Sequence, residues 1–221
     1  MYTNVLIFIS NNLQLVCLCI SSNNCYCSIT TTFFVSKNNK SYIQKMKLPC
    51  YQNNTPLDPS FDDDLKDVHL VYDYDATDSN GRPEKWRYEI WFFSENKIVY
   101  AIHGGPMAGR INYQTVAYQC VRPGEIWQIN WLEETGTVVS IVYDIVNKTV
   151  NGLLCFSKGH WENSEAAHGD KRNPDDFARW RNLAKQGIQT DRFVLVERAH
   201  ILKSFKGQGD LEPIEPDAIT F

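Results

Sequence analysis

The stretch TVAYQCVRPGEIWQINWLEETGTVVSIVYDIVNKTVNGLLCF, residues 115–156, decides the fold class. It contains four apolar runs, at 115–121, 125–133, 137–144 and 149–156, separated by the short breaks RPG, ETG and VNK. Val, Ile, Trp and Tyr favour strands, whereas Pro, Gly and Asn favour turns. Strands spaced this closely predict an antiparallel meander, which closes as a barrel or flattens into a sandwich.

The same pattern extends outward in both directions. Further strands are predicted at 68–74, 86–93, 97–103 and 192–204. In the first of them Leu70, Tyr72 and Tyr74 share one face, because side chains alternate along a strand. The sequence therefore predicts a mainly β domain.

One helix interrupts the strands. Asn173 is a good N-cap, Pro174 suits the first helical position, and Gly187 is a natural end. The expected apolar stripe comprises Phe177, Trp180 and Ala184. We therefore expect a single helix flanking the barrel.

Composition limits the classes of partner. The chain has 221 residues, enough for one well-packed domain, and a formal charge of −4, which argues against nucleic acid or an anionic membrane as the main partner. No run approaches the roughly 18 apolar residues of a membrane span. Cys50, Cys120 and Cys155 are scattered and indicate reduced thiols in a cytoplasmic protein.

Residues 1–45 differ from the rest of the chain. They contain no Asp, Glu or Arg, and the remainder has 19 basic and 26 acidic residues, a formal charge of −7. A secretory signal needs a basic start and an unbroken apolar run, and residues 1–45 have neither. A mitochondrial presequence is rich in Arg, which these residues lack. The third interpretation, which we adopt, is a disordered or non-native extension, followed by the domain at 46–206 and an acidic tail at 207–221.

Three clusters of residues carry possible chemistry. Tyr72 and Tyr74 place two hydroxyls on one strand face, where they can bind one polar end of a ligand or simply fill the core. The segment HGGPMAGR, residues 103–110, ends in a guanidinium suited to a planar anion, and it lacks the spacing of a dinucleotide loop. His103 in it is either a base or a structural residue.

The third cluster is WLEETGT, residues 131–137. Glu133 shares a face with Trp127, Ile129 and Trp131, so a carboxyl is expected at the end of an apolar wall, where burial favours the neutral acid. Alternation turns the neighbouring Glu134 away from that face. Glu133 is therefore a candidate proton donor; the alternative is a glutamate in water beside a turn.

Together these segments resemble a known family. VYDY, WRYEI, YAIHGGPMAGR and WLEETGT, in this order, are similar to phenolic acid decarboxylases, and the resemblance is clear from about residue 67 to 156. It implies a lipocalin-like antiparallel β-barrel, a homodimer, and a site inside the barrel that needs no metal or organic cofactor. The chain departs from bacterial members in three places. The turn before Trp86 is longer, Ala101 stands where arginine is common, and Glu134 replaces a proline.

The resemblance also implies roles for particular residues. Its catalytic set falls on Tyr72, Tyr74, Arg110 and Glu133. Its substrate-binding set falls on Trp86, Tyr88, Ile102 and Thr137. The implied substrates are para-hydroxycinnamic acids such as ferulic, p-coumaric and caffeic acid. Two other classes remain open: a lipocalin-like carrier of a small aromatic or lipid, and a structural sandwich that binds a partner.

The extension is predicted to be dispensable, because it has neither the charge balance nor the strand periodicity of the domain. A chain that starts at Met46 should match the full chain in melting temperature and in turnover. Thermal unfolding and steady-state kinetics of the two chains test this. A loss of several degrees, or of most of the activity, would show that residues 1–45 pack on the domain.

Overall fold

The computed structural model describes residues 5–10, 13–18, 49–78 and 80–221. The chain divides into two compact units, Met1–Met46 and Lys47–Phe221. In the first unit, β1 (Val5–Ser10) and β2 (Leu13–Leu18) form an antiparallel pair. Most of the extension predicted at 1–45 lies outside the described residues, so its dispensability stays a prediction.

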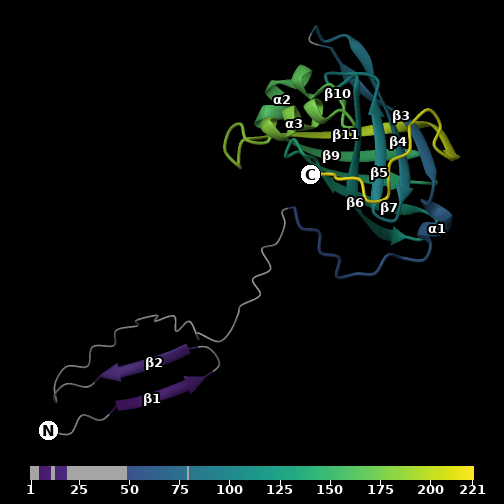
Figure 1. Cartoon of the computed structure of the whole chain (residues 1–221). Coiled ribbons are helices and arrows are strands. Elements are labelled where there is room, and N and C mark those ends of the chain that lie inside the picture. Colours follow the sequence, from purple (N-terminus) through teal and green to yellow (C-terminus); the bar gives the residue numbers. More distant parts are fainter. Residues whose placement is uncertain (1–4, 11–12, 19–48, 79) are drawn as a thin grey trace. The chain divides into compact units, whose positions relative to one another are not determined.

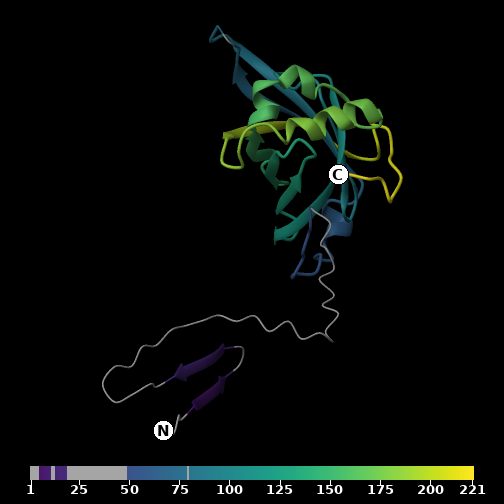
Figure 2. The same cartoon turned by 60° about the vertical axis from the view of Figure 1, so that its left-hand side comes forward.

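The second unit is built around an antiparallel β-barrel (Figures 1 and 2). Its strands are β3 (Val68–Thr77), β4 (Pro83–Ser94), β5 (Lys97–Ile102), β6 (Arg110–Arg122), β7 (Ile126–Leu132), β8 (Val138–Asp144), β9 (Thr149–Ser157) and β11 (Arg192–Lys206). They follow the order β6-β5-β4-β3-β11-β9-β8-β7, and β7 also pairs with β6. This last pairing closes the ring, which confirms the barrel and excludes the flattened sandwich.

Two strands begin earlier than the sequence indicates. β6 begins at Arg110 rather than near 115, and pairs with β5 from Ile102↔Arg110 onward. β4 begins at Pro83, because its pairing with β3 continues to Thr77↔Pro83. In β4 the neighbouring strand extends a segment, 83–85, whose own residues have weak strand preference. The early start of β6 places Arg110 on the barrel wall.

The helical segment lies between β9 and β11 in the chain and packs on one side of the barrel (Figures 1 and 2). It consists of α2 (Lys158–Glu162), the 3-10 helix η1 (Ser164–Ala167), the short strand β10 (Gly169–Asp170) and α3 (Pro174–Leu183). A further short helix, α1 (Phe61–Asp64), precedes β3. Within the residues that the structure describes, no helix is long and apolar enough to cross a membrane.

The start of α3 is confirmed, and its apolar stripe differs from the prediction. The Asn173 side chain accepts a hydrogen bond from the Asp175 backbone N–H, with Pro174 in the first turn. Trp180 and Leu183 are buried, whereas Ala184, expected in the stripe, is exposed. The helix ends at Leu183, before the predicted end at Gly187. The buried stripe is therefore shorter than predicted, and its last residue is Leu183 instead of Ala184. Trp180 is the residue that reaches the site.

The barrel interior follows the alternation that the sequence predicts. Leu70, Tyr72 and Tyr74 of β3 are buried, as are Trp127, Ile129 and Trp131 of β7. The tail after β11 packs outside the barrel, where Leu211 lies against Trp91, Val99 and Ala101. The tail therefore covers part of the outer surface of β4 and β5.

Candidate active site

A cavity inside the barrel brings together most of the predicted site residues. It is lined by Tyr72, Tyr74, Tyr88, Ile102, Arg110, Glu133 and Thr137 among others. The cavity has a volume of about 30 Å³, and by this measure about 10–15 Å³ is needed to hold one water molecule. An aromatic ligand therefore requires the lining side chains to move apart.

Three tyrosines form one wall of the cavity. Tyr72 and Tyr88 lie opposite each other on β3 and β4, with ring centroids 5.9 Å apart, and Tyr74 meets Tyr88 edge-on at 5.3 Å. Burial raises the pKa of each of these phenols well above its ordinary value. All three therefore keep their protons at neutral pH and can donate hydrogen bonds to an anion.

Glu133 lies at the other side of the cavity, at a tight turn. β7 ends at Leu132, and the Gly136 N–H bonds to the Glu133 carbonyl oxygen, with Gly136 at φ +80°. Glycine tolerates this left-handed backbone, so it allows β7 to turn sharply into β8. The Glu133 carboxyl is buried, with 6% of its surface exposed, which excludes the alternative of a glutamate in water.

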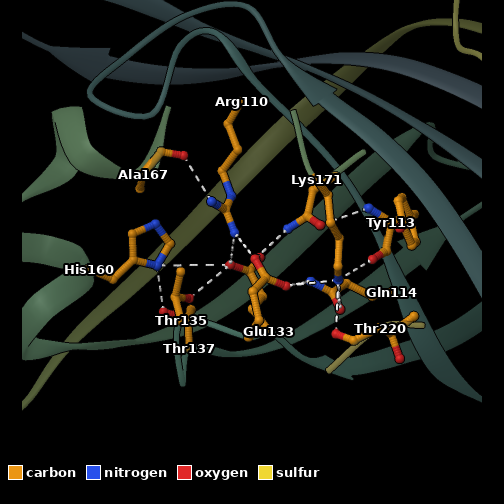
Figure 3. A network of polar contacts seen from close by, with 12 residues as sticks. Arg110, Tyr113, Gln114, Glu133, Thr135, Thr137, His160, Ala167, Lys171 and Thr220 are labelled. Atoms are coloured by element: carbon orange, nitrogen blue, oxygen red, sulfur yellow. Dashed lines mark hydrogen bonds and ion pairs between the residues drawn. The ribbon is translucent and has the colours of Figure 1, made fainter. Parts of the chain in front are cut away.

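Four side chains donate hydrogen bonds to the Glu133 carboxyl. Tyr100 Oη bonds to Oε1 at 2.5 Å, and Trp131 Nε1 bonds to the same oxygen at 3.4 Å. Arg110 Nη2 and Thr135 Oγ1 bond to Oε2 at 3.2 and 3.3 Å (Figure 3). These contacts hold the carboxyl in one orientation at the edge of the cavity.

Arg110 is fully buried, and protein groups occupy its terminal nitrogens. Nη1 donates to the Ala167 carbonyl at 2.9 Å, and Nη2 donates to Glu133 and to Glu134. The guanidinium lies over the Trp180 ring, 3.8 Å from its centroid. Burial lowers the pKa of Arg110, but the two carboxylates more than offset this and raise it, so the group stays cationic. Its contacts orient Glu133.

The predicted orientation of Glu134 is wrong. Its carboxyl is buried beside Glu133, because alternation stops where β7 ends and the turn carries both side chains inward. Lys171 Nζ bonds to Glu134 Oε2 at 2.9 Å and Gln114 Nε2 bonds to it at 2.6 Å. Glu134 thus lies between two buried cations, Arg110 and Lys171.

Two other predicted positions lie outside the cavity lining. Trp86 packs beneath the turn after β5, where a side chain on Gly105 would meet its ring at 2.5 Å. His103 is exposed, and its Nε2 lies 2.8 Å from Glu89 Oε2 on the outside of the barrel. The structure therefore gives His103 a hydrogen-bond partner rather than a place in the cavity.

Two polar residues of the cavity lining were missed by the sequence analysis. Tyr100 lies two residues before Ile102 on β5 and shares its face, so its inward direction could have been predicted from the strand pattern. His160 comes from α2, where no periodic pattern points to the cavity. Only the packing of the helical segment reveals it.

Comparison with known proteins identifies the barrel. The family model described as phenolic acid decarboxylase matches residues 63–202, which include every cavity residue named above. The chain belongs to the phenolic acid decarboxylase family. This confirms the resemblance carried by the tyrosine pair, the HGGPMAGR segment and the WLEETGT segment.

Two curated members of the phenolic acid decarboxylase family are similar in sequence. Phenolic acid decarboxylase PadC of Bacillus subtilis is 34% identical over 98 residues, which cover 44% of this chain and 55% of that protein. A probable phenolic acid decarboxylase of Vibrio cholerae is 30% identical over 90 residues, 40% of this chain and 47% of that protein. The chain thus spans about half the length of the curated relatives it matches.

The buried Glu134 should stabilise this family member strongly. Glu134→Gln removes the charge between Arg110 and Lys171 and leaves two buried cations with one carboxylate. Removing one partner of a buried ion pair costs about 3–5 kcal/mol, which urea unfolding at neutral pH should detect. Glu125→Gln, at the exposed pair with Arg122, is the control and should change stability by less than about 1 kcal/mol. Equal stability of the two variants would contradict the ion-pair interpretation.

The same contacts predict a dependence on pH. Burial raises the pKa of Glu134, but Arg110, Lys171 and the Gln114 hydrogen bond outweigh it and lower the pKa from 4.5 to about 2. A group whose folded pKa is depressed stabilises the fold above its unfolded pKa and loses this effect as the pH falls. The free energy of unfolding of wild type should therefore exceed that of Glu134→Gln by its full amount above pH 4.5. This difference should shrink as the pH approaches 2. A difference that is constant across this window would contradict the prediction.

Proposed function

We propose that this protein removes the carboxyl group of para-hydroxycinnamic acids, such as ferulic, p-coumaric and caffeic acid, to give vinylphenols. The reaction is non-oxidative and uses no cofactor. Glu133 delivers the proton. The observation that carries the proposal is a buried carboxyl, held by four donors, facing a cavity with a tyrosine wall in a barrel of this family.

The substrate itself supplies the electrons that the reaction needs. When the para-hydroxyl ionises, its electrons pass through the ring and the alkene, and the carbon that bears the carboxylate takes a proton. The product of this step is a quinone methide. Cleavage of the bond to CO2 then forms the vinyl group and returns the electrons to the ring. The vinylphenolate takes up a proton, Glu133 is reprotonated, and the net change is loss of CO2.

The cavity offers what this sequence requires. Neutral tyrosine hydroxyls at Tyr72, Tyr74 and Tyr88 can hold an anionic end of the substrate by donating hydrogen bonds. Ile102 and Trp131 provide apolar wall beside the flat ring. General acid catalysis requires a carboxyl near the accepting carbon, and Glu133 is the carboxyl that lines the cavity among the described residues.

Arg110 and Tyr100 act through Glu133 in this scheme. Arg110 orients one carboxyl oxygen, and the Tyr100 hydroxyl contacts the other. A hydroxyl can both donate and accept, so the Tyr100 contact persists whether Glu133 is charged or neutral. Arg110 is therefore proposed as a positioning residue. The homodimer and the cytoplasmic location that the resemblance implies stay predictions.

Glu133→Gln should be the most damaging conservative substitution. The amide keeps the size of the side chain and can still accept hydrogen bonds at its one oxygen, but it cannot give a proton to carbon. General acid catalysis contributes about 10²–10⁴-fold. The kcat should therefore fall at least about 100-fold, while an unreactive analogue still binds. Steady-state kinetics and calorimetric binding provide the two measurements.

Glu89→Gln is the matched control for this test. Glu89 is as buried as Glu133, 7% against 6% exposed, and bonds to His69 and His103, but it lies outside the cavity lining. Its kcat should stay within a few-fold of wild type. If Glu133→Gln keeps most of its turnover, Glu133 is not the acid. Binding without turnover by the wild-type protein would favour the carrier.

The para-hydroxyl of the substrate should be obligatory. Cinnamic acid and its para-methoxy ether are similar in shape to p-coumaric acid, but neither can form a quinone methide. The loss of the ultraviolet absorbance of the conjugated acid should therefore be seen with p-coumaric acid and not with these two. Turnover of either analogue at a comparable rate would require a different electron sink and reject the mechanism.

A further inference from the structure

His160 is a buried polar residue that the reaction scheme above does not use. It lines the cavity and is 2% exposed. Its Nδ1 lies 2.7 Å from Thr137 Oγ1 and 3.9 Å from Glu133 Oε2 (Figure 3). Its other nitrogen, Nε2, is buried with no hydrogen-bond partner among the described residues. A buried polar nitrogen without a partner costs stability, so its retention needs an explanation.

The local fold holds this ring firmly. Ser157 caps α2 by accepting from the His160 backbone N–H. Gly159 allows α2 to approach α3, because a side chain there would lie 2.1 Å from the Leu183 carbonyl oxygen. The Phe156 ring packs edge-on against His160, with centroids 5.2 Å apart. The imidazole therefore keeps its position beside Thr137 and Glu133.

Thr137 favours one of the two positions for the proton of the His160 ring. Its hydroxyl accepts a hydrogen bond from the Ser157 backbone N–H at 3.4 Å. The hydroxyl proton then has one acceptor among the described residues, His160 Nδ1. Because Nδ1 accepts, the proton of a neutral imidazole lies on Nε2. The unpartnered atom is thus an N–H donor.

The ring stays neutral in this position. Burial lowers the pKa of His160 well below 6.5, and the nearby charge of Arg110 lowers it further, against an opposing effect of Glu134. A neutral donor suits an anionic ligand because it carries no charge that must be neutralised when the cavity is empty. The tyrosine hydroxyls of the opposite wall have the same character.

We propose that His160 is a substrate-binding residue, whose Nε2–H donates a hydrogen bond to an anionic oxygen of the substrate. Thr137 is its positioning residue. This inference rests on the proposed function, since the oxygen is the carboxylate or the ionised para-hydroxyl of the hydroxycinnamate. It also gives Thr137, assigned to substrate binding by resemblance, an indirect role through the histidine.

Nitrogen NMR of the ligand-free wild-type protein, labelled with ¹⁵N-histidine, tests the tautomer. His160 Nε2 should show the shift and the bonded proton of a pyrrole-type nitrogen at neutral pH, and Nδ1 should be pyridine-type. Saturating 3-(4-hydroxyphenyl)propanoate, which has both polar ends but no alkene to protonate, should move the Nε2 proton downfield. A proton on Nδ1, or an Nε2 proton that the ligand leaves in place, would overturn the proposal.

The same spectra identify the oxygen. 3-Phenylpropanoate has the carboxylate alone, and 4-ethylphenol has the hydroxyl alone. The one that reproduces the downfield shift carries the bonded end. If neither ligand nor the complete analogue moves the Nε2 proton while calorimetry shows that they bind, the substrate does not contact His160.

Variants provide a second, independent measurement. His160→Leu removes the donor and should weaken analogue binding by about 10–100-fold, the range for hydrogen bonds to charged groups. His160→Gln places an N–H near the Nε2 position and should recover most of this loss. Thr137→Val should weaken binding to a lesser degree, since the tautomer is no longer fixed. Unchanged binding in His160→Leu, with only a lower melting temperature, would show a purely structural role.

Failure of the inference can be told apart from failure of the proposed function. If wild type turns over p-coumaric acid but the His160 variants bind and react as it does, only the inference is wrong. If wild type turns over no para-hydroxycinnamate, the proposed function is wrong, and the NMR experiment still reports whether His160 contacts a bound anion.

Discussion

The cost of burying the Arg110 guanidinium is the constraint on which this site depends. A charge inside a protein is costly unless it is paired and hydrogen-bonded. Arg110 meets this requirement with the Glu133 and Glu134 carboxyls, the Ala167 carbonyl and the face of Trp180. These partners come from the β7–β8 turn, from η1 and from α3. One buried charge therefore fastens the helical segment to the barrel and places Glu133 at the cavity.

Lys171 extends this arrangement to the outside of the barrel. Burial lowers its pKa to about 8, against the opposing effect of Glu134. Its ammonium bonds to Glu134, and it also reaches the Tyr113 and Thr220 carbonyls. Thr220 belongs to the C-terminal tail, so the tail is tied to the same network that holds Arg110. The tail lies beyond the residues that match the family model, 63–202.

The two adjacent glutamates have separate surroundings because they lie in a turn rather than in a strand. Glu133 faces the cavity and is surrounded by neutral donors and one arginine nitrogen. Glu134 lies between Arg110 and Lys171 and is absent from the cavity lining. In the proposed reaction this separation lets Glu133 exchange its proton while Glu134 remains the constant counter-charge.

The sequence by itself determined the antiparallel meander and several residues of the cavity lining. Alternation along 68–74 places Tyr72 and Tyr74 on an inward face, because a strand directs every second side chain to the same side. Glu133 lies one residue beyond β7 and continues the inward face of Ile129 and Trp131. The N-cap at Asn173 was also predictable, since its side chain bonds to a neighbouring backbone group. Such features depend on residues close together in the chain, and a single sequence contains them.

Only the tertiary structure decided the network of buried polar groups beside the cavity. Arg110, Glu134 and Lys171 come together from β6, a turn and the segment before α3, and His160 enters from α2. The alternation rule failed for Glu134 because β7 ends at Leu132, two residues before it. Buried charges find their partners across the whole fold, so their positions depend on packing between distant elements. Local pattern carries no information about which distant elements meet.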